Sequence, residues 1–524
     1  METPLSPLDF MRRARRLYAN HEAVVDGDLR LTYEQFFARC DRWSAAMSRE
    51  LGVVPGDRVA YIAPNTHAQL ESFYAVPQLG AVLVPINYRL TADDFAYIIS
   101  HSGARVVCAH ADYLELVDRI RDRIPGVAHF VALEGTREGW LDYEALVAAG
   151  GSFAPPVIAE TDLMTINYTS GTTARPKGVM ITHRNAYINT IGTLVHVPMA
   201  ALTERYLWTL PMFHANGWTF VWTVTAVGGV HVCLRRVEPP RIFAELARER
   251  ITMLCAAPTV LIGIAGAPDE LRRTAPSGVR VITAGAPPAA ATINRVEQEL
   301  GWVILHVYGL TETAPFITVC EPRPEHARLP PGERAVVKAR QGVELITSGE
   351  LLVIGDDGRE VAHDGQSIGE IVVRGNAVMA GYYDDPEATA QALRGGYFHS
   401  GDAAVVHPDG YVEIRDRIKD VIISGGENIS SIEVEGVLLR HAAVLEVAVV
   451  GMPSEKWGES PHAFVVVRTG VAVTEAELQR FTRDHLAHFK CPQAVHFVTE
   501  LPKTATGKIQ KYVLRGHRAG IATQ

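Results

Sequence analysis

The stretch of this sequence best suited to chemistry is "YTSGTTARPKGV", residues 168–179, which follows an apolar run. Backbone N–H groups of a glycine-containing turn after a strand form an anion-binding concavity, to which hydroxyl groups and a lysine add donors. The sequence therefore predicts a phosphate-binding loop, with an ordinary polar loop as the alternative that composition alone leaves open. The residues expected to bind phosphate are Thr169, Ser170, Gly171, Thr172, Thr173 and Lys177.

The spacing differs from the familiar nucleotide-binding P-loop. The pattern G-x-x-x-x-G-K-[ST] requires a glycine directly before the lysine, and Pro176 stands there instead. Lys177 is then followed by Gly178 rather than by serine or threonine. A switch-type nucleoside triphosphatase is therefore disfavoured.

A second pair of residues follows from hairpin geometry. If "AVVHPDGYVEI" turns between Pro408 and Gly410, residue 407 faces residue 411 and, counting back, residue 402 faces residue 416. This register predicts that Asp402 lies beside Arg417. A carboxylate can accept from both hydroxyls of a ribose while an adjacent arginine donates. A surface salt bridge is the alternative explanation of such a pair.

Read as a whole, the first stretch resembles the phosphate loop of the adenylate-forming enzyme family, which includes acyl-CoA synthetases, luciferases and peptide-synthetase adenylation domains. The resemblance spans the chain, because further motifs of the family appear in order. They are "LPMFHANGW" (210–218), "AGAPP" (284–288), "YGLTET" (308–313), "HSGD" (399–402), "RDRIKDVIISGGENIS" (415–430) and "PKTATGKIQK" (502–511).

The resemblance implies a set of nucleotide-binding residues. Thr311 would touch phosphate and Glu312 would hold Mg²⁺, although a lone Thr-Glu is more typical of a helix cap. Asp402 and Arg417 would bind the ribose. The other residues implied at the ATP or AMP site are Gly285, Ala286, Pro287, His306, Val307, Tyr308 and Gly309.

The resemblance also implies a two-step mechanism. Lys508 corresponds to the lysine that catalyses adenylation, together with Lys177 and Thr311, and Lys419 corresponds to a hinge about which the C-terminal part rotates. Gly425 and Gly426 would border the CoA channel, where a missing side chain lets a pantetheine arm approach. The alternatives are an exposed lysine in a basic tail and a simple glycine turn.

The same motifs bear on the acid. Peptide-synthetase adenylation domains carry an aspartate in the segment that matches "MFHANGW", whereas no acidic residue lies between Leu210 and Val232 here. We therefore expect a non-amino acid, such as a short- to medium-chain fatty acid. His214, Trp218 and Val307 are the expected acyl-pocket residues, although a core helix would give the same apolar pattern.

The predicted activity is that of an AMP-forming acyl-CoA synthetase that uses ATP, Mg²⁺ and CoA. The 524 residues contain no carrier-protein segment, so a separate acceptor is expected. One alternative is a ligase that loads a separate acyl carrier protein, and another is a nucleotide-binding protein without catalytic activity. Luciferase-like oxidation is less favoured, because nothing in the sequence indicates an oxygen-dependent role.

These residues need a scaffold, and the first 400 residues alternate helical patterns with short β-rich runs such as "RVAYIAP" (58–64) and "WVILHVYG" (302–309). That alternation predicts parallel sheets covered by helices, hence an α/β fold. Asp-Gly hairpins indicate a β-rich subdomain over about 340–418. The predicted large domain covers 1–418, and a small mobile α+β domain covers 419–524.

Composition excludes several classes. A formal net charge of −9 argues against a nucleic-acid binder, although residues 501–524 hold five basic residues and no acid. Six scattered cysteines without a CxxC pair suggest neither a zinc site nor disulfides, which fits a cytoplasmic location. The sequence predicts no signal peptide and no membrane span. A monomer and a homodimer are equally compatible with it.

Overall fold

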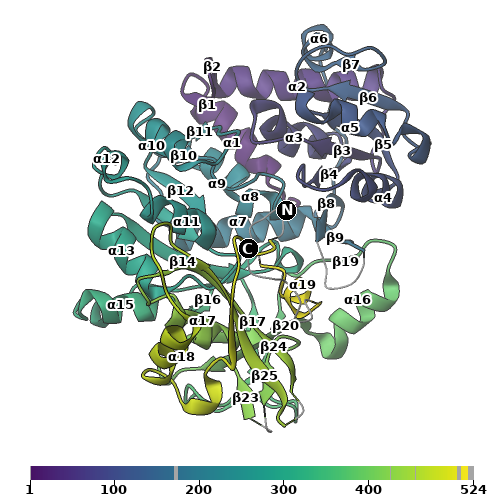
Figure 1. Cartoon of the computed structure of the whole chain (residues 1–524). Coiled ribbons are helices and arrows are strands. Elements are labelled where there is room, and N and C mark those ends of the chain that lie inside the picture. Colours follow the sequence, from purple (N-terminus) through teal and green to yellow (C-terminus); the bar gives the residue numbers. More distant parts are fainter. Residues whose placement is uncertain (1, 170–174, 425–426, 455, 504–508, 517–524) are drawn as a thin grey trace.

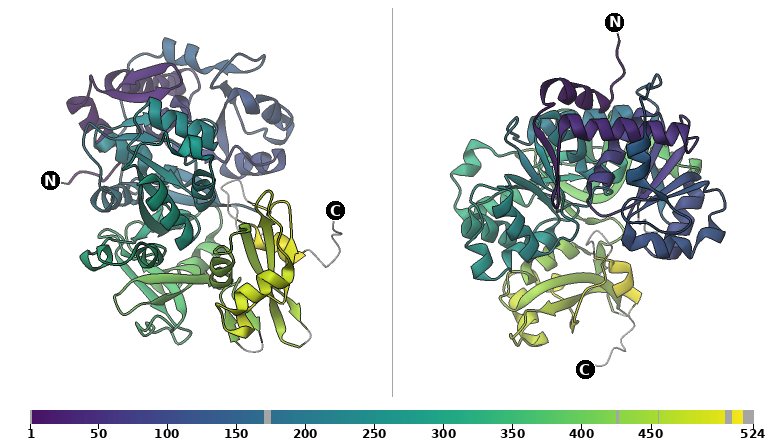
Figure 2. Two further views of the ribbon diagram at one scale, coloured as in Figure 1. Left: turned by 60° about the vertical axis from the view of Figure 1, so that its left-hand side comes forward. Right: turned by 90° about the horizontal axis from the view of Figure 1, so that it is seen from above.

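The structure is a computed structural model that describes residues 2–169, 175–424, 427–454, 456–503 and 509–516 (Figure 1). Those residues form four β-sheets with helices packed against them. Two large sheets lie in the N-terminal part, and a smaller sheet with its own helices lies at the opposite end (Figure 2). The predicted α/β class, with a large N-terminal part and a small C-terminal part, is confirmed.

The first large sheet has nine strands. Its inner strands are parallel, while β2, β15 and β16 pair antiparallel at the two ends. In spatial order the strands are β16 (Val343–Glu344), β15 (Phe316–Val319), β14 (Val303–Gly309), β13 (Arg280–Thr283), β12 (Met253–Ala256), β10 (Arg205–Leu207), β11 (Val230–Val232), β1 (Glu22–Asp26) and β2 (Leu29–Thr32).

The second large sheet has eight strands. Six are parallel, and β9 and β19 extend one edge in antiparallel fashion. In spatial order the strands are β19 (Gly381–Tyr382), β9 (Lys177–Thr182), β8 (Leu163–Thr169), β4 (Val82–Ile86), β3 (Arg58–Ile62), β5 (Ala104–Ala109), β6 (His129–Ala132) and β7 (Leu141–Asp142). The predicted parallel sheets are therefore present, and antiparallel strands extend their edges.

Three helical layers bury the sheets, as in doubly covered parallel sheets. Apolar residues of α10 (Pro239–Arg248), α11 (Pro258–Ala265), α13 (Ala290–Leu300) and α15 (Pro331–Lys338) cover the nine-stranded sheet. Residues of α4 (Ala92–Ser102) and α5 (Leu114–Asp118) cover the eight-stranded sheet. The largest core contains residues of α1 (Leu8–Leu17), α2 (Tyr33–Arg49), α3 (His67–Gln78), α6 (Tyr143–Ala149), α8 (Ala215–Trp218) and α9 (Phe220–Ala226), and α7 (His183–His196) adds a buried alanine to it.

Local sequence explains where the central helices begin. Thr32 caps α2 through a capping box with Gln35. Thr66 caps α3, because its side chain accepts from the Gln69 N–H. Every residue of α3 is buried, which explains its weak amphipathic pattern. None of the helices in the described ranges is both long and apolar enough to cross a membrane.

The β-rich region contains an antiparallel four-stranded sheet of β17 (Glu350–Ile354), β18 (Gly369–Arg374), β20 (Phe398–Val406) and β21 (Val412–Arg417). The hairpin predicted around Gly410 is the β20–β21 pair. The run "LLVIGDDGREV" also turns back on itself at its Asp-Gly pair. The Val361 N–H donates to the Val353 carbonyl and the Gly355 N–H to the Arg359 carbonyl, while β17 pairs along its length with β18.

The C-terminal sheet consists of β23 (Glu427–Ile429), β22 (Ile422–Ser424), β25 (Gly458–Val467), β24 (Val444–Ser454) and β26 (Ala494–Phe497). It packs with α17 (Ser431–Leu438), α18 (Glu475–Arg483) and α19 (Lys511–Gly516). Thr474 accepts from the Glu477 N–H at the start of α18. The remaining helices are α12 (Asp269–Arg272), α14 (Pro324–Ala327) and α16 (Pro386–Ala392).

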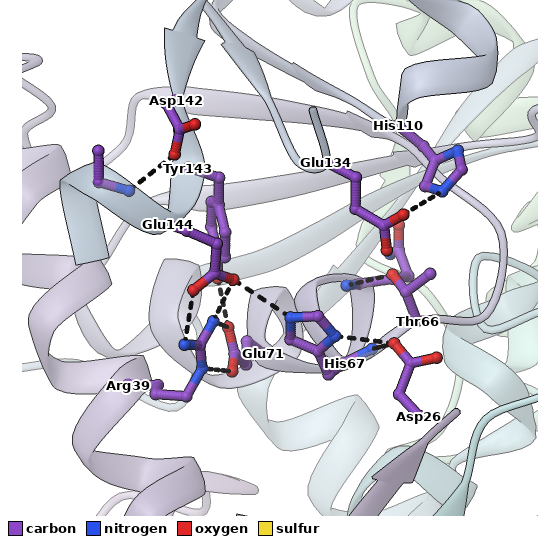
Figure 3. A network of polar contacts seen from close by, with 12 residues as sticks. Asp26, Arg39, Thr66, His67, Glu71, His110, Glu134, Asp142, Tyr143 and Glu144 are labelled. Atoms are coloured by element: carbon purple, nitrogen blue, oxygen red, sulfur yellow. Dashed lines mark hydrogen bonds and ion pairs between the residues drawn. The ribbon is translucent and has the colours of Figure 1, made fainter. Parts of the chain in front are cut away.

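A network of charged side chains joins β1 to the helices beside the eight-stranded sheet (Figure 3). His67 Nδ1 lies 2.7 Å from Asp26, and His67 Nε2 lies 3.3 Å from Glu144. Arg39 binds both Glu144 and Glu71, each at 2.6 Å. Burial would lower the pKa of His67, but Asp26 and Glu144 raise it to about 9. The network therefore ties α2, α3 and α6 to a strand of the other sheet.

Candidate active site

The predicted phosphate loop connects two paired strands. Thr169, the last residue of β8, lies opposite Lys177, the first residue of β9. Ser170, Gly171, Thr172 and Thr173 lie outside the described residues. Gly178 packs so closely that a Cβ there would lie 2.9 Å from Ile166. The hairpin therefore fixes Lys177 directly beside the end of β8.

Lys177 belongs to a small cluster with two residues from distant segments. Its Nζ lies 4.8 Å from the ring centroid of Tyr382, a cation–π distance. The Tyr382 hydroxyl donates to Glu312 Oε1 at 2.9 Å. Burial, followed by the charge of Glu312, raises the pKa of Tyr382, so this hydroxyl stays a donor. Lys177 and Glu312 are therefore held on the two sides of one tyrosine.

Glu312 fits the magnesium role implied by the sequence. It is half-buried in the short helical turn Thr311–Thr313, which follows β14. Within the described ranges no group of three or more His, Cys, Asp or Glu side chains is placed to hold a metal ion. Mg²⁺ commonly binds one or two carboxylates together with substrate phosphates and water, so one glutamate beside a phosphate loop suits it. Thr311 precedes this glutamate in the same turn.

Asp402 stands at the centre of a second cluster. Arg417 Nε lies 2.6 Å from Asp402 Oδ1, and the Tyr308 hydroxyl donates to Asp402 Oδ2 at 2.6 Å. Asp402 is 3% exposed, whereas Tyr308 and Arg417 are half-buried. Burial raises the pKa of Tyr308, and the charge of Asp402 adds to that effect. The three side chains form a fixed polar group between β14 and the β20–β21 hairpin.

The strand register of this hairpin differs by one residue from simple counting. Residues 407 and 411 face each other as predicted, since the His407 N–H donates to the Tyr411 carbonyl. A bulge between Ala403 and Ala404 then shifts the pairing, so that Asp402 lies opposite Arg417 rather than Asp416. The bulge therefore makes the predicted neighbours direct cross-strand partners.

The remaining nucleotide-site predictions fall on two adjacent strand ends. Gly285 has φ +90° and follows β13, and both Gly285 and Ala286 are exposed, with Pro287 after them. His306 is buried, and its Nδ1 lies 2.8 Å from the Arg340 carbonyl, so that nitrogen carries the proton. Burial lowers the pKa of His306 to about 4, so the ring is neutral. Gly309 allows close packing, because a Cβ there would lie 1.8 Å from the Pro315 carbonyl.

Two of the predicted acyl-pocket residues belong to the largest apolar core. Val307 and Trp218 are 2% and 4% exposed and belong to one apolar cluster. The Trp218 and Phe316 rings meet edge-on, with 5.7 Å between their centroids. A Cβ added to Gly285 would lie 4.0 Å from the Trp218 ring. Half-buried His214 directly precedes α8, the short turn that ends at Trp218. Trp218 therefore stands between β14 and the glycine loop after β13.

Trp218 lies in a segment whose backbone conformation is unusual. Five consecutive residues from Ala215 to Thr219 have positive φ, with values of 36°, 49°, 54°, 51° and 68°. This conformation costs about 1–2 kcal/mol for each non-glycine residue, so other contacts must hold it. Gly217 is required there, because a Cβ would lie 2.7 Å from the Trp208 ring.

The segment around the predicted hinge contacts the C-terminal helices. Asp416, 2% exposed, accepts from the N–H of Ser431 at 2.8 Å at the start of α17. Exposed Lys419 lies just after β21, between Asp416 and the next strand. Gly425, Gly426 and Lys508 lie outside the described residues. Their predicted roles, like the hinge itself, stay predictions.

Sequence reasoning missed Tyr382 and Phe316. Tyr382 reaches Lys177 because β19 adds to β9, where Tyr382 pairs with Val179. No local pattern signals a pairing across some two hundred residues of chain. Phe316 reaches Trp218 through the antiparallel return of β15 along β14.

Comparisons with known families support the resemblance seen in the motifs. Residues 10–383 match the family described as AMP-binding enzyme. Residues 433–508 match the family described as AMP-binding enzyme C-terminal domain. Together the two matches cover most of the chain.

Characterised relatives align along nearly the full length. The chain is 44% identical to 4-hydroxybutyrate–CoA ligase 2 of Metallosphaera sedula, over 99% of this chain and 96% of that protein. It is 40% identical to the peroxisomal butyrate–CoA ligase AAE11 of Arabidopsis thaliana, over 98% and 93%. The crystal structure of the anthranilate CoA ligase AuaEII with anthranoyl-AMP superposes with a TM-score of 0.89 at 26% identity, covering 98% of both chains.

Proposed function

Because the chain belongs to the AMP-binding enzyme family, and is an acid–thiol ligase that uses ATP, Mg²⁺ and CoA, we propose that it activates a short, non-amino carboxylic acid. The acid would be a short- to medium-chain aliphatic acid or one of similar size. A carrier protein as acceptor has no support among the relatives named above, which are CoA ligases.

The chemistry requires two half-reactions. A carboxylate is a poor acyl donor, because its leaving group would be oxide. In the first step a carboxylate oxygen bonds to the α-phosphorus of ATP, and pyrophosphate leaves with the electrons of the broken P–O bond. In the second step the CoA sulfur, having lost its proton, bonds to the acyl carbon and AMP leaves. Positioning and charge neutralisation account for most of such catalysis.

One observation supports the proposal: successive residues at the end of β14 belong to an apolar and to a polar group. Val307 belongs to the same apolar cluster as Trp218, whereas the Tyr308 hydroxyl donates to Asp402. Alternate residues of a strand point to opposite faces, so one strand end borders both an apolar and a polar region. Ligands of α/β sheets bind at such carboxyl ends. An acid and a nucleotide would thus meet where β14 ends.

On the nucleotide side, we assign the ribose to Asp402 and Arg417 and the phosphates to Lys177, Thr311 and the loop after Thr169. The 2.6 Å contact with Arg417 holds the Asp402 carboxylate in one orientation, in which it would accept from ribose hydroxyls. Lys177, placed beside the end of β8, would neutralise phosphate charge. Glu312 would hold the magnesium ion, which when bound neutralises charge on the phosphates.

On the acid side, Trp218, Phe316 and Val307 make an apolar wall, with His214 at its edge. No acidic residue between Leu210 and Val232 is present to pair an ammonium group. The names of the relatives, 4-hydroxybutyrate–CoA ligase and butyrate–CoA ligase, support an acid of about this size. The cytoplasmic location stays a prediction, because the Arabidopsis relative is named as peroxisomal.

For the second half-reaction we assign Lys419 as the hinge and Gly425 and Gly426 as the border of the CoA channel. Lys508 would catalyse the first half-reaction only. The matching test is the Lys508→Ala variant, which should lose acyl-AMP formation and retain acyl transfer to CoA from supplied acyl-AMP. Equal loss of both half-reactions would contradict this division of labour.

Mass spectrometry tests the proposal directly. Enzyme, ATP, Mg²⁺ and CoA are incubated with a panel of straight-chain, branched and aromatic acids, and all product masses are read. An acyl-CoA product from a short or medium acid is the expected result, and it names the acid class. Acyl-AMP accumulating without thioester would reject CoA as acceptor. No adenylate with any acid would overturn the proposal.

A further inference from the structure

A closed ring of three buried hydrogen bonds joins β8 to the turn that carries Trp218. Thr165 Oγ1 donates to Asn167 Oδ1 at 2.8 Å, and Asn167 Nδ2 donates to Asn216 Oδ1 at 3.2 Å. Asn216 Nδ2 closes the ring by donating to Thr165 Oγ1 at 2.9 Å. The three side chains are 0%, 3% and 4% exposed. Each member of the ring therefore gives one proton and accepts one.

The direction of the ring is fixed from outside. Asn167 Nδ2 also donates to the Phe213 carbonyl at 3.2 Å, and a carbonyl can only accept. This contact sets which amide atom of Asn167 is nitrogen. The same contact ties Phe213, the residue before His214, to β8. Asn167 therefore holds both Phe213 and Asn216, which lie on either side of His214 in the sequence.

The ring joins two segments that each lead to one of the proposed substrate sites. The paired strands β8 and β9 form the phosphate hairpin, in which Thr169 lies opposite Lys177. Asn167 is two residues from Thr169. Asn216 is two residues from Trp218, the central side chain of the apolar wall. A shift of β8 against the turn would therefore change the distance between acid and nucleotide.

The turn depends on such contacts, because its backbone is disfavoured. Asn216 has φ 49° and ψ 50°, within five consecutive left-handed residues. Asparagine tolerates this region better than most residues, and its side chain here bonds to another strand. At the far end of the turn Thr219 Oγ1 bonds to Thr193 at 3.1 Å. The ring and this contact hold the two halves of the turn.

We propose that the ring of Thr165, Asn167 and Asn216 sets the position of the acyl wall relative to the phosphate hairpin, with Asn216 as a positioning residue for adenylation. This inference rests on the proposed function. In that step the carboxylate oxygen must approach the α-phosphorus in line, and a misplacement of about 1 Å costs on the order of 10²-fold in rate. The ring acts on that approach without touching either substrate.

Substitutions on both strands of the ring test this role. Thr165→Val removes the hydroxyl at nearly equal volume, and Thr165→Ser keeps it. Asn216→Ala removes the amide, and Asn216→Gly removes it from a residue that adopts positive φ freely. Single-turnover acyl-AMP formation is measured with the preferred acid, together with the KM for ATP and the relative kcat/KM for shorter and longer acids.

We expect Thr165→Val, Asn216→Ala and Asn216→Gly each to slow adenylation about 10- to 100-fold and to change the preference among acids, with an unchanged KM for ATP. Thr165→Ser should retain most of the rate. The double variant Thr165→Val with Asn216→Gly should be little slower than the slower single variant, because both break one ring.

Gln78→Ala is the matched control. Gln78 is a buried amide that donates to Ser44 at 2.7 Å between α2 and α3, outside either substrate region. It should lower the melting temperature as the ring variants do, with an unchanged adenylation rate per folded molecule. Ring variants that lose only stability would overturn the positioning role while the wild type still adenylates. A wild type inactive with every acid would overturn the proposed function itself, and this inference with it.

Discussion

Two buried carboxylates in this molecule have the same kinds of partner. Glu71 binds Arg39 at 2.6 Å and accepts from the Tyr143 hydroxyl at 2.5 Å. Asp402 binds Arg417 at 2.6 Å and accepts from the Tyr308 hydroxyl at 2.6 Å. By residue type alone the two groups are equivalent.

Their surroundings differ. The Glu71 group continues through Arg39 to Glu144, and from there to His67 and Asp26 (Figure 3). Its members are therefore bound to other charged side chains of the protein. Its arginine side chain is 17% exposed, whereas that of Arg417 is 31% exposed at the end of the β20–β21 hairpin. One carboxylate is thus enclosed by other protein groups, and we propose that the other binds the ribose beside the more exposed arginine. The residue types of a carboxylate–arginine–tyrosine group therefore do not show whether it binds a ligand. The surroundings of the group, either other protein side chains or accessible space, indicate that.

The sharpest test of this contrast is Asp402→Asn. If Asp402 binds both ribose hydroxyls, this change should lower kcat/KM for ATP by about 10² to 10³, the usual loss for a group that orients a reacting substrate. The melting temperature should fall less than in Glu71→Gln, since the Arg417 side chain is 31% exposed and Tyr308 still has an oxygen to donate to. Pyrophosphate release at varied ATP gives the first quantity, and thermal unfolding gives the second. An unaltered kcat/KM would make the Asp402 group structural, like the Glu71 group.

Glu71→Gln should show the opposite behaviour. It leaves the buried Arg39 without its full counter-charge, which costs about 3–5 kcal/mol of unfolding free energy. Urea unfolding measures that loss, and activity per folded molecule should stay at the wild-type value. Glu144→Gln is a useful comparison, because the Glu144 side chain is 52% exposed and an exposed pair contributes only about 0–1 kcal/mol. Equal losses for the two variants would contradict the distinction between the buried and exposed ends of the network.

The network should also give stability a pH dependence that His67→Gln removes. The folded-state pKa of His67, about 9, lies above its ordinary value of 6.5. Protonated His67 therefore stabilises the fold fully below pH 6.5, and that contribution, about 3 kcal/mol, is lost as pH rises through 9.

Urea unfolding at pH 6, 7.5 and 9 measures this effect. The difference between wild type and His67→Gln should shrink steadily with rising pH. On the acid side Glu144, whose pKa the His67 and Arg39 contacts lower to about 2 against burial, loses its stabilising charge as pH falls from about 4.5 toward 2. A constant difference over pH 6 to 9 would mean that His67 has the same pKa in the folded and the unfolded protein.

The two regions also differ in how far the sequence predicts them. Asp402 and Arg417 share one hairpin, so counting from the turn was enough to place them together, and the bulge changed the register by only one residue. Glu71 lies 32 residues from Arg39 and 72 from Tyr143, and packing among three helices joins them. Nothing local marks that contact, since every residue of α3 is buried.

The same limit applies to the fold and to the acyl side. The strands predicted from alternating β-rich runs are present, from β3 at Arg58–Ile62 to β14 at Val303–Gly309. Their order in the sheets was not predictable, since β10 pairs with β12 as well as β11, and β11 with β1. Thr165 and Asn216 are likewise 51 residues apart. Periodicity identifies elements and turns fix near neighbours, whereas long-range pairing depends on the packing of the whole core.

The smallest expected effect separates two tyrosines that each donate to a glutamate. Tyr382→Phe removes the 2.9 Å hydrogen bond to Glu312 but keeps the ring 4.8 Å from Lys177. Losing one such bond costs about 1 kcal/mol, so kcat should fall roughly fivefold, and more Mg²⁺ should be needed for half-maximal rate because Glu312 is less well oriented. Tyr143→Phe removes the equivalent donor from Glu71, and it should lower stability without changing the Mg²⁺ requirement. Titrating Mg²⁺ for both variants decides the matter: an equal shift in the two would mean that Tyr382, like Tyr143, only supports the fold.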